Sequence, residues 1–201
     1  MAEWIMPFPD SKITGHYGTL SEYRKRKGMQ PHSGTDWAAK AGTLIPAITS
    51  GTVKLIQYSK ILGWVVVQTG WDAEAKKTKY IGYCHLYCSF HGAECKGPSA
   101  GCKSPLKSTK VGDKVEVGQK YLRVGNSGSA TTGAHLHATL GNTLKSVFGV
   151  TAAKEDLYRF IQSKSKGTTP KQETPKAKPV VESKVETKII YACPHCKKEL
   201  K

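Results

Sequence analysis

Three short segments, far apart in the sequence, carry residues that bind metals and transfer protons. They are His32-Ser33-Gly34-Thr35-Asp36, Tyr83-Cys84-His85-Leu86 and His135-Leu136-His137. Only a fold that places distant segments side by side, as the strands of a sheet lie, can gather these imidazoles and the carboxylate at one site. This requirement is the strongest constraint that the sequence sets on its fold.

His135 and His137 lie two positions apart in the apolar run 134–140. A β-strand turns alternate side chains to the same face, so we expect both imidazoles to point the same way. One of them can then bind a metal while the other acts on water or substrate. A single histidine is more often a surface or packed core residue, but the ordered occurrence of all five residues favours a joint role.

These residue types suit catalytic zinc, which usually takes three protein ligands and keeps its fourth position for water. Two imidazoles and one carboxylate from separate segments supply such a set. The remaining two histidines are then free to transfer protons. The pattern therefore indicates a zinc hydrolase.

The three segments resemble the motifs of the lysostaphin-type (LytM-like) zinc endopeptidases, which cut peptide bonds in bacterial peptidoglycan. HSGTD, YCHL and GAHLH are the matching sequences, and the turn at 124–128 is also similar, within a resemblance that covers about residues 13–140. The resemblance implies a mainly β fold, with the antiparallel β-sheet core of the lysostaphin/LytM peptidases. It implies His32, Asp36 and His137 as ligands of one catalytic Zn²⁺ ion, and His85 and His135 as catalytic residues.

By this resemblance the reaction is hydrolysis of an amide bond in a peptidoglycan stem peptide or cross-bridge, in cell-wall lysis. Zinc would polarise the carbonyl and lower the pKa of bound water. His135 would be the general base, and His85 would stabilise the oxyanion or pass a proton to the leaving amine, although these roles could be exchanged. A tyrosine often assists in the family, and Tyr17 and Tyr23 are the candidates. The alternative is a catalytically inactive peptidoglycan-binding regulator of another hydrolase.

Composition divides the chain into three regions. We expect a zinc peptidase domain over 1–163, a flexible linker over 164–188 and a short C-terminal segment over 189–201. The linker is rich in lysine, proline, threonine and glutamate, and its few large apolar residues cannot form a core.

Local patterns within the first region predict its elements. The runs 51–56 and 63–68, bounded by glycines, are typical of β-strands. The segment 111–118 predicts a compact β-hairpin with glycine turns between alternating valines. Apolar residues at helical spacing, with Asp156 near the start, predict a short helix over 152–163 that closes the domain.

An insertion over about 84–108 contains four cysteines, with His91 among them: Cys84, Cys88, Cys95 and Cys102. Their spacing differs from the paired CxxC units of common zinc sites, so a structural zinc ion, disulfides and free thiols all remain open. Because little core can form in this segment, some cross-link would offset the entropy of ordering it. Strand alternation predicts that Cys84 faces away from His85, which argues against a catalytic role for the Cys84 thiol.

The C-terminal segment contains Cys193-Pro194-His195-Cys196, half of what a zinc ribbon requires. Cys193 and Cys196 could bind structural zinc, with the missing ligands supplied by another tail in a dimer or by His195. A redox-active pair and an unpaired remnant are the alternatives.

The chain of 201 residues has a formal net charge of +16. This charge attracts polyanionic partners or surfaces, an effect that salt weakens. Anionic polymers of bacterial walls fit this description better than nucleic acid does, given the site residues. A solvated basic surface would account for the charge without any partner.

No run approaches the about eighteen apolar residues of a membrane-spanning helix, so we expect no membrane span. Residues 1–10 lack a basic start followed by an apolar stretch, so we expect no ordinary signal peptide. The expected setting is a bacteriophage endolysin, held in the host cytoplasm until holin-type release to the cell wall, or a virion-associated lysin.

Overall fold

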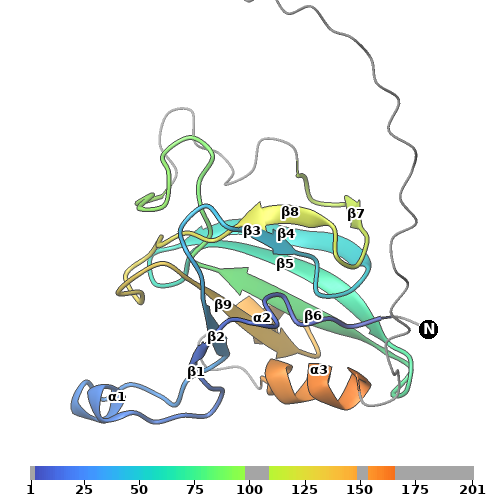
Figure 1. Cartoon of the computed structure of the whole chain (residues 1–201), viewed down its shortest axis with the longest axis horizontal. Coiled ribbons are helices and arrows are strands. Elements are labelled where there is room, and N and C mark those ends of the chain that lie inside the picture. The colour runs from blue at the N-terminus through green and yellow to red at the C-terminus, as the bar shows by residue number, and fades with distance from the viewer. Residues whose placement is uncertain (1–2, 98–108, 149–153, 166–201) are drawn as a thin grey trace, which may run out of the picture. The chain divides into compact units, whose positions relative to one another are not determined.

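The computed structural model describes residues 3–97, 109–148 and 154–165. They form a seven-stranded sheet, a two-stranded sheet and three short helices (Figure 1). The strands are β1 (Ile13–Gly15), β2 (Thr35–Ala38), β3 (Leu44–Pro46), β4 (Gly51–Ser59), β5 (Gly63–Asp72), β6 (Lys77–Cys84), β7 (Lys114–Val115), β8 (Lys120–Arg123) and β9 (His135–Gly141). The helices are α1 (Glu22–Arg26), α2 (Leu144–Phe148) and α3 (Leu157–Ser165). None of these described helices has the length and apolar character needed to cross a membrane.

The larger sheet has the strand order β1-β2-β9-β6-β5-β4-β7, and its paired strands are antiparallel. The predicted antiparallel core is therefore confirmed, including the strands expected at 51–56 and 63–68. Strand β9 lies between β2 and β6, although these strands are far from it in the sequence. This order brings the three histidine-bearing segments to adjacent positions.

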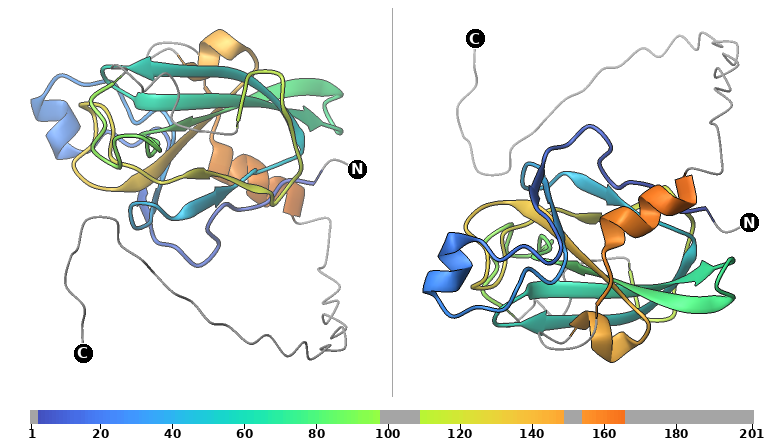
Figure 2. Two further views of the ribbon diagram at one scale, coloured as in Figure 1. Left: turned by 90° about the horizontal axis from the view of Figure 1, so that it is seen from above. Right: turned by 90° about the horizontal axis from the view of Figure 1, so that it is seen from below.

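Both faces of the larger sheet are covered, which explains why β5 is apolar and buried along most of its length. One face packs against the small β3-β8 sheet and α3 in the main core, through residues such as Trp64, Leu122 and Leu157. The other face carries a second cluster, in which Val147 of α2 packs against β5 and β6. Figure 2 shows α2 and α3 on opposite sides of the sheet.

The predicted hairpin over 111–118 is wrong, although its glycine turns are present. Gly112 and Gly118 have φ angles of 100° and 79°, which glycine adopts without strain. Between them, β7 pairs with β4 at the sheet edge, and the chain then continues into β8, which pairs with β3. The strand partners are distant segments, and local turn chemistry does not reveal them.

The predicted C-terminal helix is present, but it begins at Leu157 rather than near 152. Residues 152 and 153 lie outside the described ranges. Glu155 instead forms an isolated β-bridge with Leu140, and the Asp156 carboxylate caps the helix by accepting from Arg159 N at 3.0 Å. Apart from the last turn of α3, the predicted linker and C-terminal segment also lie outside the described residues, so both stay predictions.

Glu155 also neutralises a buried ammonium group on the sheet. The Lys79 side chain is 3% exposed, and its Nζ lies 2.6 Å from Glu155 Oε1 and 3.0 Å from Asn142 Oδ1. Because a buried charge without its partner is costly, this pair fixes the chain entering α3 against the sheet.

We expect Glu155→Ala to lower the free energy of unfolding by about 3 kcal/mol, since it leaves the Lys79 ammonium buried without its carboxylate. Urea unfolding followed by circular dichroism measures the change. Glu22→Ala is the matched control, because its ion pair with Lys25 joins side chains that are 79% and 53% exposed. That control should change stability by less than about 1 kcal/mol, and equal effects of the two variants would contradict the assignment.

Candidate active site

The five predicted site residues meet on the sheet face that also carries α2. Asp36 of β2 is in register with His137 of β9, which is in register with Cys84 at the end of β6. Residues directly opposite one another project from the same face of a sheet. His85 follows Cys84, and its ring centroid lies 5.0 Å from that of His135 and 5.8 Å from that of His137. The expectation that both histidines of β9 point the same way is therefore met.

Three of these residues bring their donor atoms to one point. His32 Nε2 lies 3.2 Å from His137 Nδ1 and 3.1 Å from Asp36 Oδ2, and His137 Nδ1 lies 2.7 Å from Asp36 Oδ1. Ligands of a tetrahedral zinc ion, at bond lengths of about 2.0–2.1 Å, lie about 3.3 Å apart. This group can therefore hold a metal ion.

The hydrogen bonds of His32 fix which of its nitrogens can bind a metal. Its Nδ1 lies 3.1 Å from the carbonyl oxygen of His16, which can only accept, so Nδ1 carries the hydrogen. Nε2 is therefore the His32 nitrogen that faces Asp36 and His137 and is placed to bind a metal. Such an outer hydrogen bond is the usual way in which a metal-binding imidazole is oriented.

Electrostatics also favour a cation among these three residues. Burial opposes ionisation of Asp36, but hydrogen bonds with His137 and His32 outweigh it and hold the pKa of its carboxyl well below the usual range. Burial lowers the pKa of His137, although Asp36 opposes this shift. The cluster thus combines a carboxylate with two imidazole nitrogens, and a metal ion would take the place of the hydrogens that these nitrogens share with Asp36. Such a set is the donor chemistry of a catalytic zinc site.

His85 is held in an uncommon backbone conformation, with a φ angle of 56°. Its backbone N–H donates to Leu62 O at 2.8 Å, and its Nδ1 donates to the carbonyl of Ser127 at 2.8 Å. Burial and the nearby His137 lower the pKa of His85 to about 4. The ring is therefore neutral at neutral pH, with the lone pair on Nε2.

The left-handed conformation of His85 overturns the expectation that Cys84 faces the other way. Alternation of side chains applies only while the chain is extended, and β6 ends at Cys84. Cys84 lies on the same face as His137, packed against Val65 and Val147, and burial raises the pKa of its thiol to about 12. It is a neutral core residue beside the site.

His135 is oriented like His32 and His85. Its Nδ1 lies 2.8 Å from the carbonyl oxygen of Gly133, so the hydrogen is on Nδ1, and its Nε2 lies 3.6 Å from Asp36 Oδ1. With a side chain that is 17% exposed, it is more accessible than His32 or His137, whose side chains are 6% exposed. Its Nε2 can therefore reach water or substrate next to the carboxylate.

Ser127 positions His85, a role that its residue type alone does not reveal. It lies in the turn at 124–128, whose sequence is similar to that of the lysostaphin-type peptidases. It is buried, and its hydroxyl accepts from Trp64 N at 3.0 Å and donates to Leu86 O at 2.9 Å. Its carbonyl holds His85. Of the two candidate tyrosines, Tyr17 donates its Oη hydrogen to Lys154 O at 2.7 Å, and Tyr23 is exposed on α1, so assistance by either one stays a prediction.

The structure brings together only part of the cysteine set. Cys88 and Cys95 lie close to each other and to His91, whereas Cys84 belongs to a different cluster. His91 was noted among the cysteines without being assigned as a ligand; its position in a C-x2-H-x3-C pattern is the signal for it. The other three predicted cysteines, Cys102, Cys193 and Cys196, lie outside the described residues.

No protein-family model matches the sequence. Among solved structures, the chain is similar to LytU, with 28% sequence identity and a TM-score of 0.54, over 80% of this chain and 91% of that chain. It is also similar to the catalytic domain of the antimicrobial peptidase lysostaphin from Staphylococcus simulans, with 22% identity and a TM-score of 0.52, over 76% of this chain and 93% of that one.

The fold is that of the lysostaphin-type peptidases. This confirms the predicted fold class. Compared with full-length lysostaphin, the chain is 21% identical, with a TM-score of 0.55, and covers 58% of its length. The similarity therefore concerns only part of the lysostaphin chain.

Gly34 of the HSGTD segment is required by close packing at the metal-binding group. A Cβ at this position would lie 2.5 Å from Ala138 O and 2.9 Å from His137 Nε2. The His137 ring can occupy its place only because residue 34 has no side chain.

We expect Gly34→Ala to weaken zinc binding at least about tenfold, because the new methyl group displaces a ligand ring. Competition with a chromophoric chelator measures the affinity. Gly133→Ala is the control, since no atom lies within 4 Å of a Cβ at Gly133 and its carbonyl remains available to His135. Equal zinc affinities of the two variants and the parent would show that the packing argument is wrong.

Proposed function

We propose that the protein is a zinc-dependent endopeptidase that hydrolyses amide bonds in bacterial peptidoglycan. The observation that carries the proposal is the convergence of His32, Asp36 and His137, with His85 and His135 beside them. Three donors for a metal and two further imidazoles on one sheet face are the complete set of groups for metal-assisted hydrolysis.

His32, Asp36 and His137 would hold the ion through Nε2, the carboxylate and Nδ1. Zinc, when bound, supplies Lewis-acid polarisation of the scissile carbonyl and acidifies a water molecule. The carboxylate also balances part of the charge of the ion, while the hydrogen bond from His32 to the His16 carbonyl keeps the ring oriented.

The orientations of His85 and His135 support roles for both rings in proton transfer. Each ring holds its Nδ1 hydrogen on a backbone carbonyl, so Nε2 is the nitrogen that faces water or substrate. His135, the more accessible ring next to Asp36, would take the proton from water. That proton would pass to His85, whose ring centroid lies 5.0 Å from that of His135. Because burial makes His85 a weak base, it would readily release the proton to the leaving amine or hold it near the oxyanion.

Two observations support peptidoglycan as the substrate. The fold resembles that of the catalytic domain of lysostaphin, an antimicrobial peptidase. The net charge of +16 would concentrate the protein at bacterial walls that carry anionic polymers. Release through a holin, presence in a virion, and dimer formation through the CPHC segment stay predictions.

We expect Asp36→Ala and His137→Ala each to lose the zinc of this site, and His85→Ala to retain it while turnover falls on the order of 10²-fold or more. Elemental analysis and a peptide-release assay measure these two properties separately. Glu22→Ala on α1 is the control, and it should retain both. Full activity of His85→Ala would remove its assigned role in proton transfer.

The bond that is cut can be identified directly. The full chain is incubated with peptidoglycan sacculi of several wall types, with and without a chelator, and new amino termini are identified by mass spectrometry. We expect new amines that disappear with the chelator. If zinc is bound and the protein binds sacculi, but no new amine appears on any wall, the protein is instead a wall-binding regulator.

A further inference from the structure

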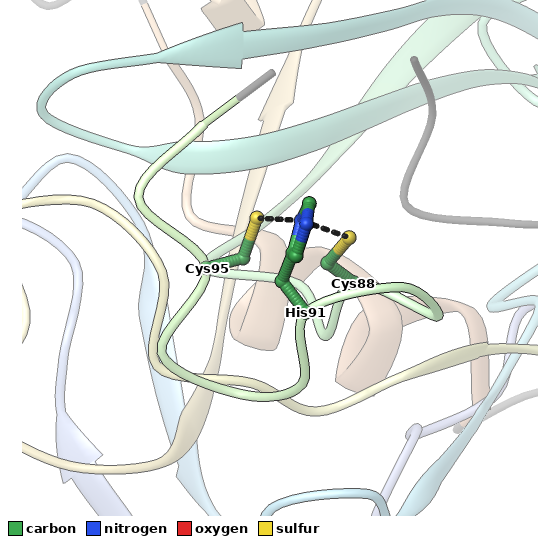
Figure 3. A group of neighbouring side chains, drawn as sticks. All are labelled: Cys88, His91 and Cys95. Atoms are coloured by element: carbon green, nitrogen blue, oxygen red, sulfur yellow. Dashed lines mark hydrogen bonds between the residues drawn. The ribbon is translucent and has the colours of Figure 1, made fainter. Parts of the chain in front are cut away.

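A second group of metal-binding side chains lies in the loop that follows His85 (Figure 3). His91 Nδ1 lies 3.9 Å from Cys88 Sγ and 3.8 Å from Cys95 Sγ, and all three donor atoms lie within 4.8 Å of one another. We propose that Cys88, His91 and Cys95 bind a structural zinc ion. The proposal does not depend on the peptidase activity.

The distances fit shared coordination of one ion. With zinc–sulfur and zinc–nitrogen bonds of about 2.3 and 2.0–2.1 Å, sulfur and nitrogen ligands of a tetrahedral site lie about 3.5 Å apart. The imidazole in Figure 3 stands between the two sulfur atoms, with Nδ1 close to both. No disulfide joins Cys84, Cys88 and Cys95 to one another. Two sulfurs and one imidazole nitrogen are the donor types that zinc prefers in structural sites.

Burial of the two cysteines points to the same conclusion. Cys88 and Cys95 are 0% and 2% exposed in the main core, whereas His91 is exposed at the surface of the loop. Sulfur atoms can thus approach an ion from the protein side while the imidazole covers it from the solvent side. A thiolate at such depth needs a cation to offset its desolvation.

Cys95 also has the outer hydrogen bond that supports a sulfur ligand. The Trp64 indole Nε1 donates to Cys95 Sγ at 3.3 Å, and Trp64 itself is buried. The indole can only donate, so the sulfur must accept. Hydrogen bonds to ligating sulfur stabilise the thiolate form and orient it toward the ion.

The loop backbone is shaped to bring these ligands together. Cys88 and Gly92 exchange two backbone hydrogen bonds, of 3.0 and 2.8 Å, and Gly92 has a φ angle of 77°. Gly92 is thus paired with Cys88, and this tight reversal brings the adjacent His91 close to the Cys88 sulfur. The residues between the two cysteines contribute little to the core, and Phe90 is 49% exposed. An ion held by three of the loop residues would supply the ordering energy that apolar contacts do not.

The loop is connected to the turn that positions His85. Asn126 donates its backbone N–H to Ala93 O at 2.9 Å and its side-chain amide to Glu94 Oε1 at 2.7 Å. Thr131 Oγ1 donates to Asn126 Oδ1 at 2.6 Å, and Ser127 is the next residue in the turn. The structural ion would therefore stabilise one wall of the active site without taking part in the reaction.

The test uses the full chain under reducing conditions, in a background that removes other metal ligands. His137→Ala disables the His/Asp site, and Cys193→Ser with Cys196→Ser removes the C-terminal thiols. Cobalt(II) is the probe, because thiolate ligands give it an intense charge-transfer absorption that nitrogen and oxygen ligands lack. We expect one equivalent of cobalt with this absorption, and its displacement by one equivalent of zinc.

Variants of the loop then assign the ligands. Cys88→Ser should abolish the charge-transfer absorption, and His91→Ala, which leaves the core intact, should weaken cobalt affinity at least about tenfold. His91→Cys should restore the affinity and strengthen the absorption. Cys84→Ser is the matched control, because Cys84 lies in the other cluster and should leave the binding unchanged.

Two results would overturn the proposal. One is a background protein that shows no thiolate–cobalt absorption and takes up no zinc; the other is metal binding that His91→Ala leaves unchanged. Because both readouts measure the metal and not hydrolysis, they stay separate from a failure of the proposed peptidase activity. Cys102 lies outside the described residues and is not part of this assignment.

Discussion

The site depends on the register of β2 against β9. Asp36 stands opposite His137, and the alternating residues Trp37 and Leu136 are buried in the main core at 1% and 0% exposure. A slip of one residue would turn Asp36 toward that core and expose Trp37. The hydrophobic effect that buries Trp37 and Leu136 therefore also holds the carboxylate beside the imidazole on the opposite face.

Backbone carbonyls also organise the site, because they orient three of its histidine rings. Three histidines donate from Nδ1 to a main-chain oxygen: His32 to His16, His85 to Ser127 and His135 to Gly133. Each therefore directs its Nε2 into the site. A carbonyl cannot donate, and this fixes the tautomer whatever the ring meets on its other side. The loops that carry these carbonyls are thus part of the candidate site, including the turn that contacts the Cys88–Cys95 loop.

The residues of the candidate site were predictable because their chemical types and order are visible in the sequence. The β-strands around them were predictable from alternation and glycine turns. The strand partners of β7 and β8 were not predictable. β7 pairs with β4 and β8 pairs with β3, and both partners are distant segments selected by packing. The orientation of Cys84 was missed for a local reason: His85 takes a left-handed φ of 56°, which interrupts the alternation and is stabilised by contacts with Leu62 and Ser127.

By itself, the sequence determined which side chains could bind zinc and transfer protons, because chemical type and spacing are properties of the chain alone. Only the tertiary structure decided which nitrogens of His32 and His85 face the site, because their partners are the carbonyls of His16 and Ser127, which are distant in the sequence. It also separated Cys84 from Cys88 and Cys95 and joined His91 to them. The order of the cysteines in the sequence is compatible with several ligand sets. Burial on different faces of the sheet excludes a set that joins Cys84 to Cys88 and Cys95.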